Sequence, residues 1–200
     1  MMNNKEIFTI GYSTFSIDNF IKTLQNYKID YLIDVRSKPV SRHYPKYNKR
    51  FLEEQLSFNN INYRNYKDEF GARQTDTQFF TDNYLDFQKF TKSEKFLSGA
   101  SKIESGMYSG YRFVLMCAEK RPETCHRCIM IARHFYDKGY TVKHILADGS
   151  YQLQSDIESL LVNKYFSSQL SIFENPMLMT EMINKSYILQ NKEIGYKINN

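Results

Sequence analysis

An apolar run and a strongly helical run are joined by the stretch Cys117-Ala118-Glu119-Lys120-Arg121-Pro122-Glu123-Thr124-Cys125-His126-Arg127-Cys128. The apolar run that precedes it, Phe113 to Cys117, predicts a buried strand. Thr124 is a suitable N-cap for a helix that runs to Lys138 and is stopped by Gly139. A strand that passes directly into a helix is typical of α/β folds, and the reactive side chains at this junction indicate where chemistry is to be sought.

The same alternation of strand and helix occurs on both sides of this stretch. Ile7 to Ile10 and Tyr31 to Val35 are predicted as buried strands. Between them, Asp18 to Tyr27 has helical spacing, with Ser16 as its N-cap, and strand–helix–strand at this spacing indicates a parallel pair. Val142 to Leu146 is predicted as the last parallel strand. The sequence therefore predicts an α/β fold, a three-layer sandwich with a mostly parallel central sheet.

The remaining segments complete this organisation. Further predicted elements are a helix over Asn48 to Asn59, a short strand over Ile61 to Arg64, and surface helices over Asp76 to Phe90 and Ser93 to Glu104. Residues 1–167 are expected to form the α/β domain, and residues 168–200 a C-terminal helical extension with one amphipathic helix, Met177 to Gln190. Its apolar stripe is more typical of a packing or dimer surface than of a ligand site, so a homodimer through this tail is one expectation.

Composition limits the class of protein. A hydrophobic fraction of 42% in 200 residues is enough for a core, and a net charge of +5 suits an anionic ligand without requiring nucleic acid. Met1 to Glu6 lacks the pattern of a secretory signal, and no run approaches the roughly 20 apolar residues of a membrane span. Three cysteines within twelve positions do not form a disulfide framework. We therefore expect a cytoplasmic protein with reduced thiols and no membrane partner.

Polar residues follow each of the predicted parallel strands. Ser13 follows the first, Asp34 and Arg36 close the second, and Cys117 and Glu119 close the third. In open parallel sheets, ligands bind beyond the carboxyl ends of the strands. These residues, although distant in sequence, are therefore expected to meet at one edge of the sheet and form one site.

The predicted helix start after Thr124 has two interpretations. Cys125 and His126 would lie in the first turn, where unpaired N–H groups and the helix dipole favour negative charge. A thiol in that position can have a lowered pKa and be reactive. The same helix end can instead bind a phosphate, with Arg36 and Arg42 supplying positive charge. Both interpretations stay open at this point.

The helical wheel separates two further side chains. Cys128 falls with Cys125, Ile129 and Phe135 on the apolar face, which favours a small buried hydrophobic role for Cys128. Arg127 projects away from that face and is expected to contact a neighbouring loop. It is also a candidate ligand-binding residue.

The cysteines lie close enough in sequence to be compared with the ligands of zinc sites. Cys117, Cys125, His126 and Cys128 form a nominal set of zinc ligands with three cysteines and one histidine. No second, distant cysteine pair exists to complete a zinc knuckle. The sequence therefore favours a site without a metal or cofactor.

Several motifs together resemble a known family. The blocks are Thr9-Ile10-Gly11-Tyr12-Ser13, Ile33-Asp34-Val35-Arg36, Ser41-Arg42, Leu115-Met116-Cys117-Ala118-Glu119, Cys125-His126-Arg127 and His144-Ile145. From about Ile7 to Gly149 the chain is similar to the domain-of-unknown-function 488 family. The resemblance implies the fold and the motif positions Asp34, Arg36, Arg42, Cys117, Glu119, Cys125, His126 and Arg127. It implies no reaction, because the activity of the family is not established.

These observations lead to one main hypothesis and two alternatives. The main hypothesis is an enzyme, a hydrolase or transferase, acting on a phosphate-bearing small molecule or nucleic acid. The expected catalytic residues are Asp34, Glu119, Cys125 and His126, and the expected substrate-binding residues are Ser13, Arg36, Arg42, Cys117 and Arg127. Asp34 and Glu119 could each act as a general base or simply orient an arginine, and the second role is the commoner one. The first alternative is sulfur-transfer chemistry at Cys125, since Asp-Val-Arg at a strand end also looks like rhodanese-type sulfurtransferases. The second is a nucleic-acid-binding module without enzymatic activity.

Overall fold

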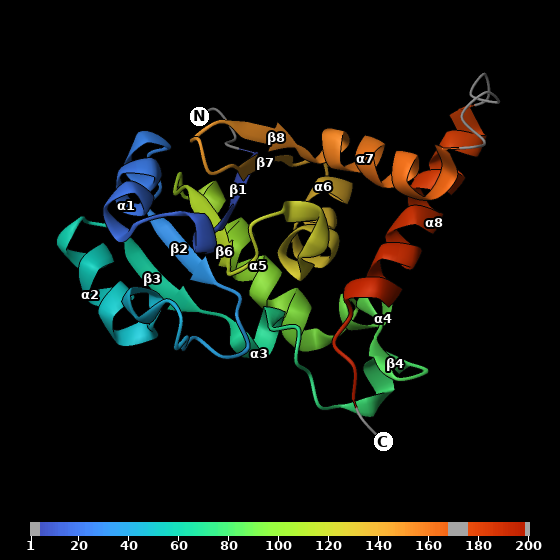
Figure 1. Ribbon diagram of the computed structural model, residues 1–200, viewed down its shortest axis with the longest axis horizontal. Helices are drawn as coiled ribbons and strands as arrows, with labels where there is room; N and C mark the ends of the chain where they lie inside the picture. The colour runs from blue at the N-terminus through green and yellow to red at the C-terminus, as the bar shows by residue number, and fades with distance from the viewer. Residues whose placement is uncertain (1–4, 168–175, 199–200) are drawn as a thin grey trace.

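The centre of the molecule is a six-stranded sheet with the strand order β3-β2-β6-β1-β7-β8, as the computed structural model in Figure 1 shows. The structure describes residues 5–167 and 176–198. The strands are β1 (Glu6–Gly11), β2 (Tyr31–Asp34), β3 (Asn62–Asn65), β6 (Phe113–Cys117), β7 (Thr141–Ile145) and β8 (Tyr151–Leu153). The four strands predicted from the longest apolar runs are all present.

Neighbouring strands are parallel except at one edge. β1 lies between β6 and β7, with Ile10 opposite Met116 and Ile145, and β2 lies between β3 and β6. β8 runs antiparallel to β7 after a tight turn in which Gly149 has a φ of +83°. A positive φ favours glycine, so Gly149 itself favours the tight turn between β7 and β8. The mostly parallel α/β sheet is therefore confirmed, and β8 is an addition to the predicted strands.

One face of the sheet is covered by α1 (Ile17–Asn26) and α2 (Lys49–Phe58). Phe20, Leu24 and Leu52 of these helices pack in one buried cluster with Phe8 and other strand residues. The predicted N-cap of α1 is confirmed, because the Ser16 side chain accepts a hydrogen bond from the backbone N–H of Asn19 at 3.2 Å.

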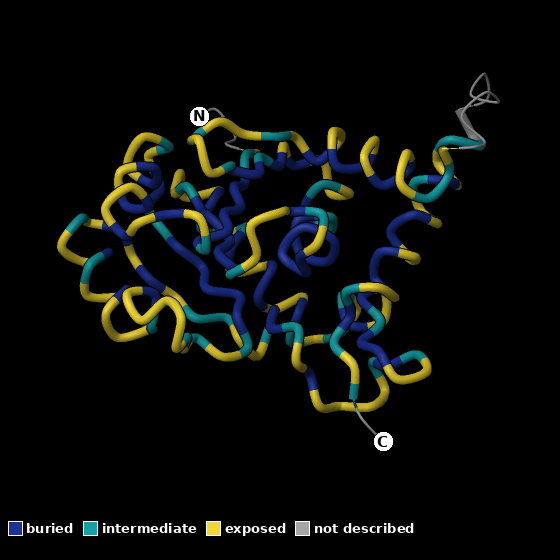
Figure 2. Tube along the Cα trace, in the orientation of Figure 1, coloured by how far each residue is buried: buried dark blue, intermediate teal, exposed yellow. Residues whose placement is uncertain are grey.

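The other face is covered by α5 (Glu94–Tyr108), by the helical segment η5 (Arg127–Ala132) with α6 (Arg133–Asp137), and by α7 (Gln154–Phe166). Phe96 and Ile103 of α5 pack in a second buried cluster with Ile33 and Leu115 from the strands. The central strands β1, β2 and β6 are accordingly buried almost throughout (Figure 2), whereas the edge strands β3 and β8 are partly exposed. Helices on both faces of a buried parallel sheet form the predicted three-layer sandwich.

The predicted helix over Asp76 to Phe90 is wrong. This segment contains the short helix η3 (Thr77–Phe79), the hairpin β4 (Phe80–Thr81) and β5 (Tyr84–Leu85), and α4 (Phe87–Phe90). Asp82 adopts a left-handed φ of 52° in the hairpin turn. The Asp86 carboxylate then accepts hydrogen bonds from the backbone N–H groups of Gln88 and Lys89. Aspartates that stabilise turns and caps outweigh the helical spacing of the aromatics here.

The C-terminal helix α8 (Pro176–Ile194) includes the predicted Met177 to Gln190 and extends beyond it. Gln190 accepts hydrogen bonds from Lys164 and Tyr165 of α7 at 2.9 and 2.7 Å. Asn191 accepts from the backbone N–H of Phe87 and donates to the carbonyl of Leu85. α8 thus packs against its own chain, and a dimer through this tail stays a prediction.

The predicted division between residues 1–167 and 168–200 falls at residues 168–175, which lie outside the described part of the chain, so it stays a prediction. None of the described helices combines the length and the hydropathy that crossing a membrane requires.

Candidate functional site

Three parallel strands end at the same level of the sheet. The register places Gly11 at the end of β1 opposite Cys117 at the end of β6, and Asp34 at the end of β2 opposite Met116. The loops that follow these strands therefore start next to one another. This is the physical reason that residues about 80 positions apart share one neighbourhood.

Gly11 allows the loop after β6 to lie close to β1. A Cβ atom at position 11 would be 1.9 Å from the carbonyl oxygen of Glu119. The φ of Gly11 is an ordinary extended −107°, so the glycine is needed for space and not for its conformation. The loop is also held by Ser13, whose N–H donates to the carbonyl of Ala118 at 3.2 Å, and by Arg127, whose Nη1 donates to the carbonyl of Glu119 at 2.7 Å.

The helix after this loop begins at His126, one residue later than predicted, and continues as η5. Thr124 belongs to the short helix η4 (Pro122–Thr124), and its hydroxyl donates backwards to the carbonyl of Arg121. Cys125 is the extended residue before the helix, with φ −129° and ψ 138°, and its Sγ accepts from the backbone N–H of Arg127 at 3.5 Å. Cys125 and not Thr124 therefore occupies the capping position. Because it precedes the helix, the helical wheel does not apply to it.

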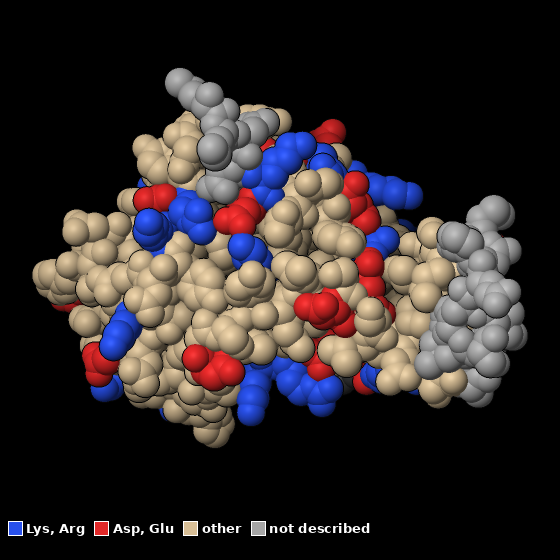
Figure 3. All heavy atoms as spheres, turned by 90° about the horizontal axis from the view of Figure 1, so that it is seen from above, with Lys and Arg blue, Asp and Glu red and all other residues tan. Residues whose placement is uncertain are grey.

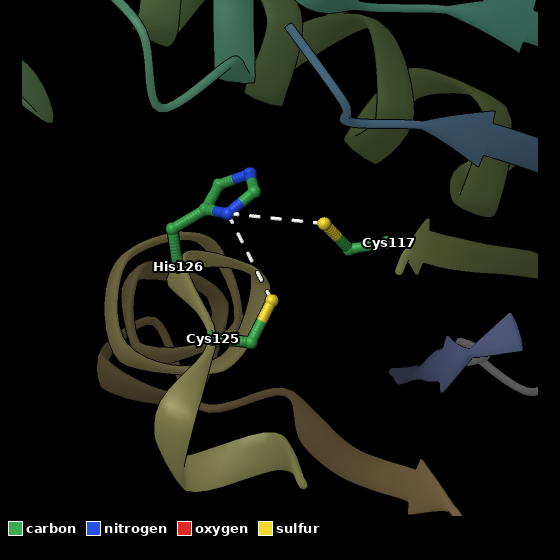
Figure 4. Close-up of side chains that lie close together, drawn as sticks. All are labelled: Cys117, Cys125 and His126. Atoms are coloured by element: carbon green, nitrogen blue, oxygen red, sulfur yellow. Dashed lines mark hydrogen bonds between the residues drawn. The ribbon is translucent and has the colours of Figure 1, made fainter. Parts of the chain in front are cut away.

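Cys117, Cys125 and His126 meet beside the end of β6 (Figure 4). The Nδ1 atom of His126 lies 3.9 Å from the sulfur of Cys117 and 3.8 Å from the sulfur of Cys125. The three atoms all lie within 4.8 Å of one another, and all three residues are buried. We call this set the Cys–Cys–His cluster.

The hydrogen bond made by Nε2 of His126 determines which way the other ring nitrogen, Nδ1, faces. Nε2 lies 3.1 Å from the backbone carbonyl oxygen of Val35, which follows β2. A carbonyl only accepts hydrogen bonds, so Nε2 carries a proton and donates it. In the neutral ring, the lone pair of Nδ1 then faces both sulfur atoms.

Glu119 adds a carboxylate to the cluster. Its Oε2 lies 3.0 Å from the Cys125 sulfur. Burial would raise the pKa of Glu119, but the charge of His126 and hydrogen bonds from the two thiols outweigh it and lower the pKa to about 2. At neutral pH this side chain is therefore a carboxylate. It accepts the hydrogen bond that Cys125 donates when the thiol is protonated.

The two thiols influence each other's ionisation. The hydrogen bond between them and burial raise the pKa of Cys117. Burial also opposes ionisation of Cys125, but the hydrogen bond from Cys117 and the charge of Arg127 lower its pKa to about 6. Burial lowers the pKa of His126, and the neighbouring Cys125 and Glu119 more than reverse this effect. The first proton lost by the thiol pair accordingly comes from Cys125.

Arg127 is fully buried, with 0% of its surface exposed. Its Nε contacts the hydroxyl of Thr9 at 3.4 Å, and its Nη2 has no hydrogen-bond partner among the described residues. A buried charge requires compensation, and the groups that raise its pKa against the effect of burial are Cys125, Cys117 and Glu119. Arg127 therefore holds the Glu119 loop, as the helical wheel predicted, and stabilises negative charge in the cluster.

Asp34 and Arg36 form a buried ion pair. Arg36 donates from Nε and Nη2 to the two carboxylate oxygens at 2.8 and 2.6 Å, and Tyr63 donates its hydroxyl to Asp34 at 2.7 Å. Arg36 also donates to the carbonyl of Tyr47 and lies over the ring of Tyr12. Asp34 thus orients Arg36. The remaining nitrogen of Arg36, Nη1, is buried and has no partner in the part of the chain that the structure describes.

A pocket of about 310 Å³ opens beside the cluster. Its lining consists of Tyr12, Arg36, Ser37, Lys38, Val40, Ser41, Ala72, Arg73, Cys117, Ala118, Glu119 and His126. Of the predicted site residues, it includes Arg36, Cys117, Glu119 and His126. The others lie outside the lining: Asp34, Cys125 and Arg127 are buried, Ser13 contributes a backbone contact, and Arg42 is exposed on the loop after β2.

One lysine and one arginine of the pocket, Lys38 and Arg73, were not among the predicted site residues. Lys38 lies in the loop after β2, between the predicted Arg36 and Arg42. Arg73 lies in the segment after α3 (Lys67–Phe70), and its backbone N–H donates to the Ser37 hydroxyl at 2.8 Å. The approach of these two loops depends on tertiary contacts, so only the basic character of each loop is visible in the sequence.

Cys128 points away from the cluster, and its predicted burial is confirmed. Its sulfur lies 3.7 Å from Nε2 of His144 and 3.8 Å from Oε1 of Gln154. His144 is itself satisfied by Thr9 and Gln154, each at 2.8 Å. This is a structural network beneath the site.

His144 predicts a pH dependence of stability. Burial, and secondarily the charge of Arg127, lower the pKa of His144 to about 3, whereas in an unfolded chain it is about 6.5. Between these values the unfolded state binds the extra proton, so the free energy of unfolding falls as pH falls. From pH 7 to pH 5 we expect this residue to contribute a loss of about 2 kcal/mol, from about 1.4 kcal/mol per unit of pKa shift.

Urea denaturation at several pH values checks this expectation. The His144→Gln variant lacks the titrating group. Between pH 7 and pH 5 its free energy of unfolding should therefore fall by about 2 kcal/mol less than that of the unaltered protein. Equal pH dependence of the variant and the unaltered protein would contradict it.

Comparison with known proteins agrees with the motif blocks. A family model described as "Domain of unknown function DUF488" matches residues 16–133, which is more than half of the chain. No curated protein and no solved structure matches the sequence. The matched range contains both partners of the buried ion pair, the whole Cys–Cys–His cluster, and the pocket residues Lys38 and Arg73. On this evidence, the chain belongs to the DUF488 family of domains of unknown function.

Proposed function

We propose that this protein is an enzyme that binds a phosphate-bearing substrate, a nucleotide or nucleic acid, in the pocket beside the Cys–Cys–His cluster. The observation that carries the proposal is the buried Nη1 of Arg36, which has no partner among the described residues although Arg36 lines the pocket. A buried N–H group without a partner costs free energy, and a phosphate oxygen would satisfy it. Lys38 and Arg73 add two more cations to the same pocket.

The pocket combines this cationic part with groups that can carry out chemistry. Glu119 lines it and is ionised, so it can orient an attacking water or hydroxyl group. Cys117 and His126 form the neighbouring part of the lining. A bound phosphate and an oriented nucleophile are what hydrolysis or group transfer needs. Asp34, which the sequence analysis considered as a base, serves here by orienting Arg36.

The size and charge of the site favour this proposal over the two alternatives. A volume of about 310 Å³ is at the lower end of the usual range for small-molecule sites, about 300–1,000 Å³. The net charge of +5 is mild and does not require nucleic acid as the ligand. On the one face drawn in Figure 3, acidic and basic side chains are interspersed. Sulfur transfer at Cys125 has less support, because that thiol is buried and outside the pocket lining.

Removal of the two exposed pocket cations tests the proposal. The double variant Lys38→Ala/Arg73→Ala should bind inorganic phosphate and AMP about 10-fold or more weakly, since a hydrogen bond to a charged group contributes about 1.5–3 kcal/mol when well formed. Isothermal titration calorimetry at low salt measures the difference.

The matched control removes two exposed lysines that lie outside the pocket. Lys22→Ala/Lys92→Ala has the same net charge as the pocket variant and should bind as the unaltered protein does. If both double variants lost affinity equally, the effect would be one of overall charge and the pocket would not be the binding site. Absence of phosphate and AMP binding by the unaltered protein would also end the proposal.

A further inference from the structure

The Cys–Cys–His cluster has the donor atoms and spacing of a metal centre. Thiolate sulfur and imidazole nitrogen are the ligands that zinc prefers in proteins. For Zn–S bonds of about 2.3 Å and a Zn–N bond of about 2.0–2.1 Å at tetrahedral angles, the sulfur-to-nitrogen distance is about 3.5 Å. The observed sulfur-to-nitrogen distances are 3.9 and 3.8 Å, about 0.3–0.4 Å longer than in that geometry, and all three donor atoms lie within 4.8 Å of one another.

The atoms around the cluster hold the donors in a metal-binding orientation. A histidine that binds metal usually donates its other ring N–H to a carbonyl or carboxylate, which fixes its orientation. His126 does this through Nε2 and the carbonyl of Val35, and its Nδ1 faces both sulfurs (Figure 4). The sulfur of Cys125 also receives the backbone N–H of Arg127. The donors lie at the end of a strand and the start of a helix, which are rigid positions.

The same geometry is less suited to a catalytic Cys–His pair. In such a pair the imidazole contacts one thiol, which must reach the substrate. Here Nδ1 is almost equally distant from two sulfurs, and Cys125 is buried outside the pocket. Two sulfur atoms and one nitrogen atom that surround a common point are arranged as the ligands of one metal ion would be.

We propose that Cys117, Cys125 and His126 bind one zinc ion with its fourth position open to the pocket. Zn²⁺ forms bonds to the two sulfurs and to Nδ1, the thiol protons and any proton on Nδ1 pass to solvent, and no oxidation state changes. Cys117 and His126 both line the pocket, whereas the Glu119 carboxylate is outside the three-donor set. Three protein ligands with an open position are typical of catalytic zinc, and zinc deaminases use a Cys/Cys/His set with a nearby glutamate.

This centre differs from the set that the sequence suggested. The nominal four-ligand set included Cys128 and was rejected because the spacing did not fit a zinc knuckle. The structure directs Cys128 towards His144 and Gln154 on the other side of the helix. The site is therefore a three-ligand centre, for which a second cysteine pair is not required. It does not depend on the phosphate site, and each can be tested alone.

Metal loading of the untagged, reduced protein tests the site. After removal of metal with a chelator and dialysis against Zn²⁺, the protein should retain about one equivalent of zinc by elemental analysis. Loading with Co²⁺ should produce a thiolate-to-cobalt charge-transfer band and the visible bands of tetrahedral cobalt. Retention of less than about 0.1 equivalent of zinc would overturn the proposal.

Matched cysteine variants locate the ion. Cys117→Ser and Cys125→Ser should weaken Zn²⁺ binding by about 100-fold or more, because loss of a ligand exceeds the 10–100-fold effect of losing an outer-shell partner. Cys128→Ser, the same replacement three residues along the chain, should keep full zinc content. Equal loss in all three variants would contradict the assignment.

A measurement on the unaltered protein covers the case in which a ligand variant does not fold. X-ray absorption of the zinc-loaded protein should show two sulfur neighbours at about 2.3 Å and nitrogen or oxygen neighbours at about 2.0–2.1 Å. Three or four sulfur neighbours, or none, would rule out this centre.

Discussion

Replacing Asp34 with alanine is expected to lower the free energy of unfolding by about 3–5 kcal/mol, because the change leaves the buried guanidinium of Arg36 without its counter-charge. Asp34 is 0% exposed and Arg36 is 6% exposed, so water cannot replace the lost carboxylate. Both carboxylate oxygens are engaged, by Arg36 and by Tyr63, and all of these contacts would be lost together. Urea denaturation followed by circular dichroism measures the change.

Two further variants show whether the cause is the unpaired charge. Tyr63→Phe removes one hydrogen bond to Asp34 and should cost less, about 1.5–3 kcal/mol. Asp34→Ala/Arg36→Met removes both charges and should be more stable than Asp34→Ala alone, because an apolar replacement of a whole buried ion pair is often nearly neutral. A cost below about 1 kcal/mol for Asp34→Ala would show that the ion pair does not stabilise this fold.

Replacing Gly11 with alanine is expected to cost about 3 kcal/mol, at the upper end for overpacking, and to displace the loop that carries Glu119. The new Cβ would meet the Glu119 carbonyl oxygen at 1.9 Å and Nη2 of Arg127 at 3.0 Å. A carbonyl oxygen cannot rotate away as a side chain can, so the backbone of the loop must move. Because that loop forms part of the pocket, the buried thiols of Cys117 and Cys125 should react faster with iodoacetamide.

Gly110 provides the comparison for this variant. It has a φ of +93° and open space where a Cβ would be placed. Gly110→Ala should therefore cost only the left-handed backbone strain, about 1–2 kcal/mol, and leave thiol labelling unchanged. If Gly11→Ala labelled no faster than Gly110→Ala, the close approach of the β6 loop to β1 would not be what protects the thiols.

The local patterns of the sequence predicted the main elements well. The buried strands and α1 were confirmed because apolar periodicity, Ser16 as a cap and glycines at turns act over a few residues. The prediction of one helix over Asp76 to Phe90 was wrong because Asp82 adopts the left-handed conformation of a turn and Asp86 caps the short helix α4. The start of the helix at Cys125 was displaced because Pro122 and Thr124 form a short helix of their own.

The candidate site was predictable in part. Placing Arg36, Cys117 and Glu119 at one edge of the sheet required only that parallel strands end together. The sequence left the same two roles open for Asp34 and Glu119, and only the structure distinguishes Asp34, which orients Arg36, from Glu119, which lines the pocket. This distinction depends on Tyr63 and Tyr47, which reach the ion pair from other elements. The contribution of Arg73 also depends on the meeting of two separate loops.

By itself, the sequence determined the layered α/β fold, the family and the sheet edge at which reactive groups gather, since these follow from short-range periodicity and strand direction. Only the tertiary structure decided which groups face one another. Cys125 and Cys128 are three residues apart, yet one precedes the helix in an extended conformation and the other lies within it, so their sulfurs point to different surroundings. The partners of His126 come from the ends of two different strands, and strand register, which no local pattern encodes, brings them together.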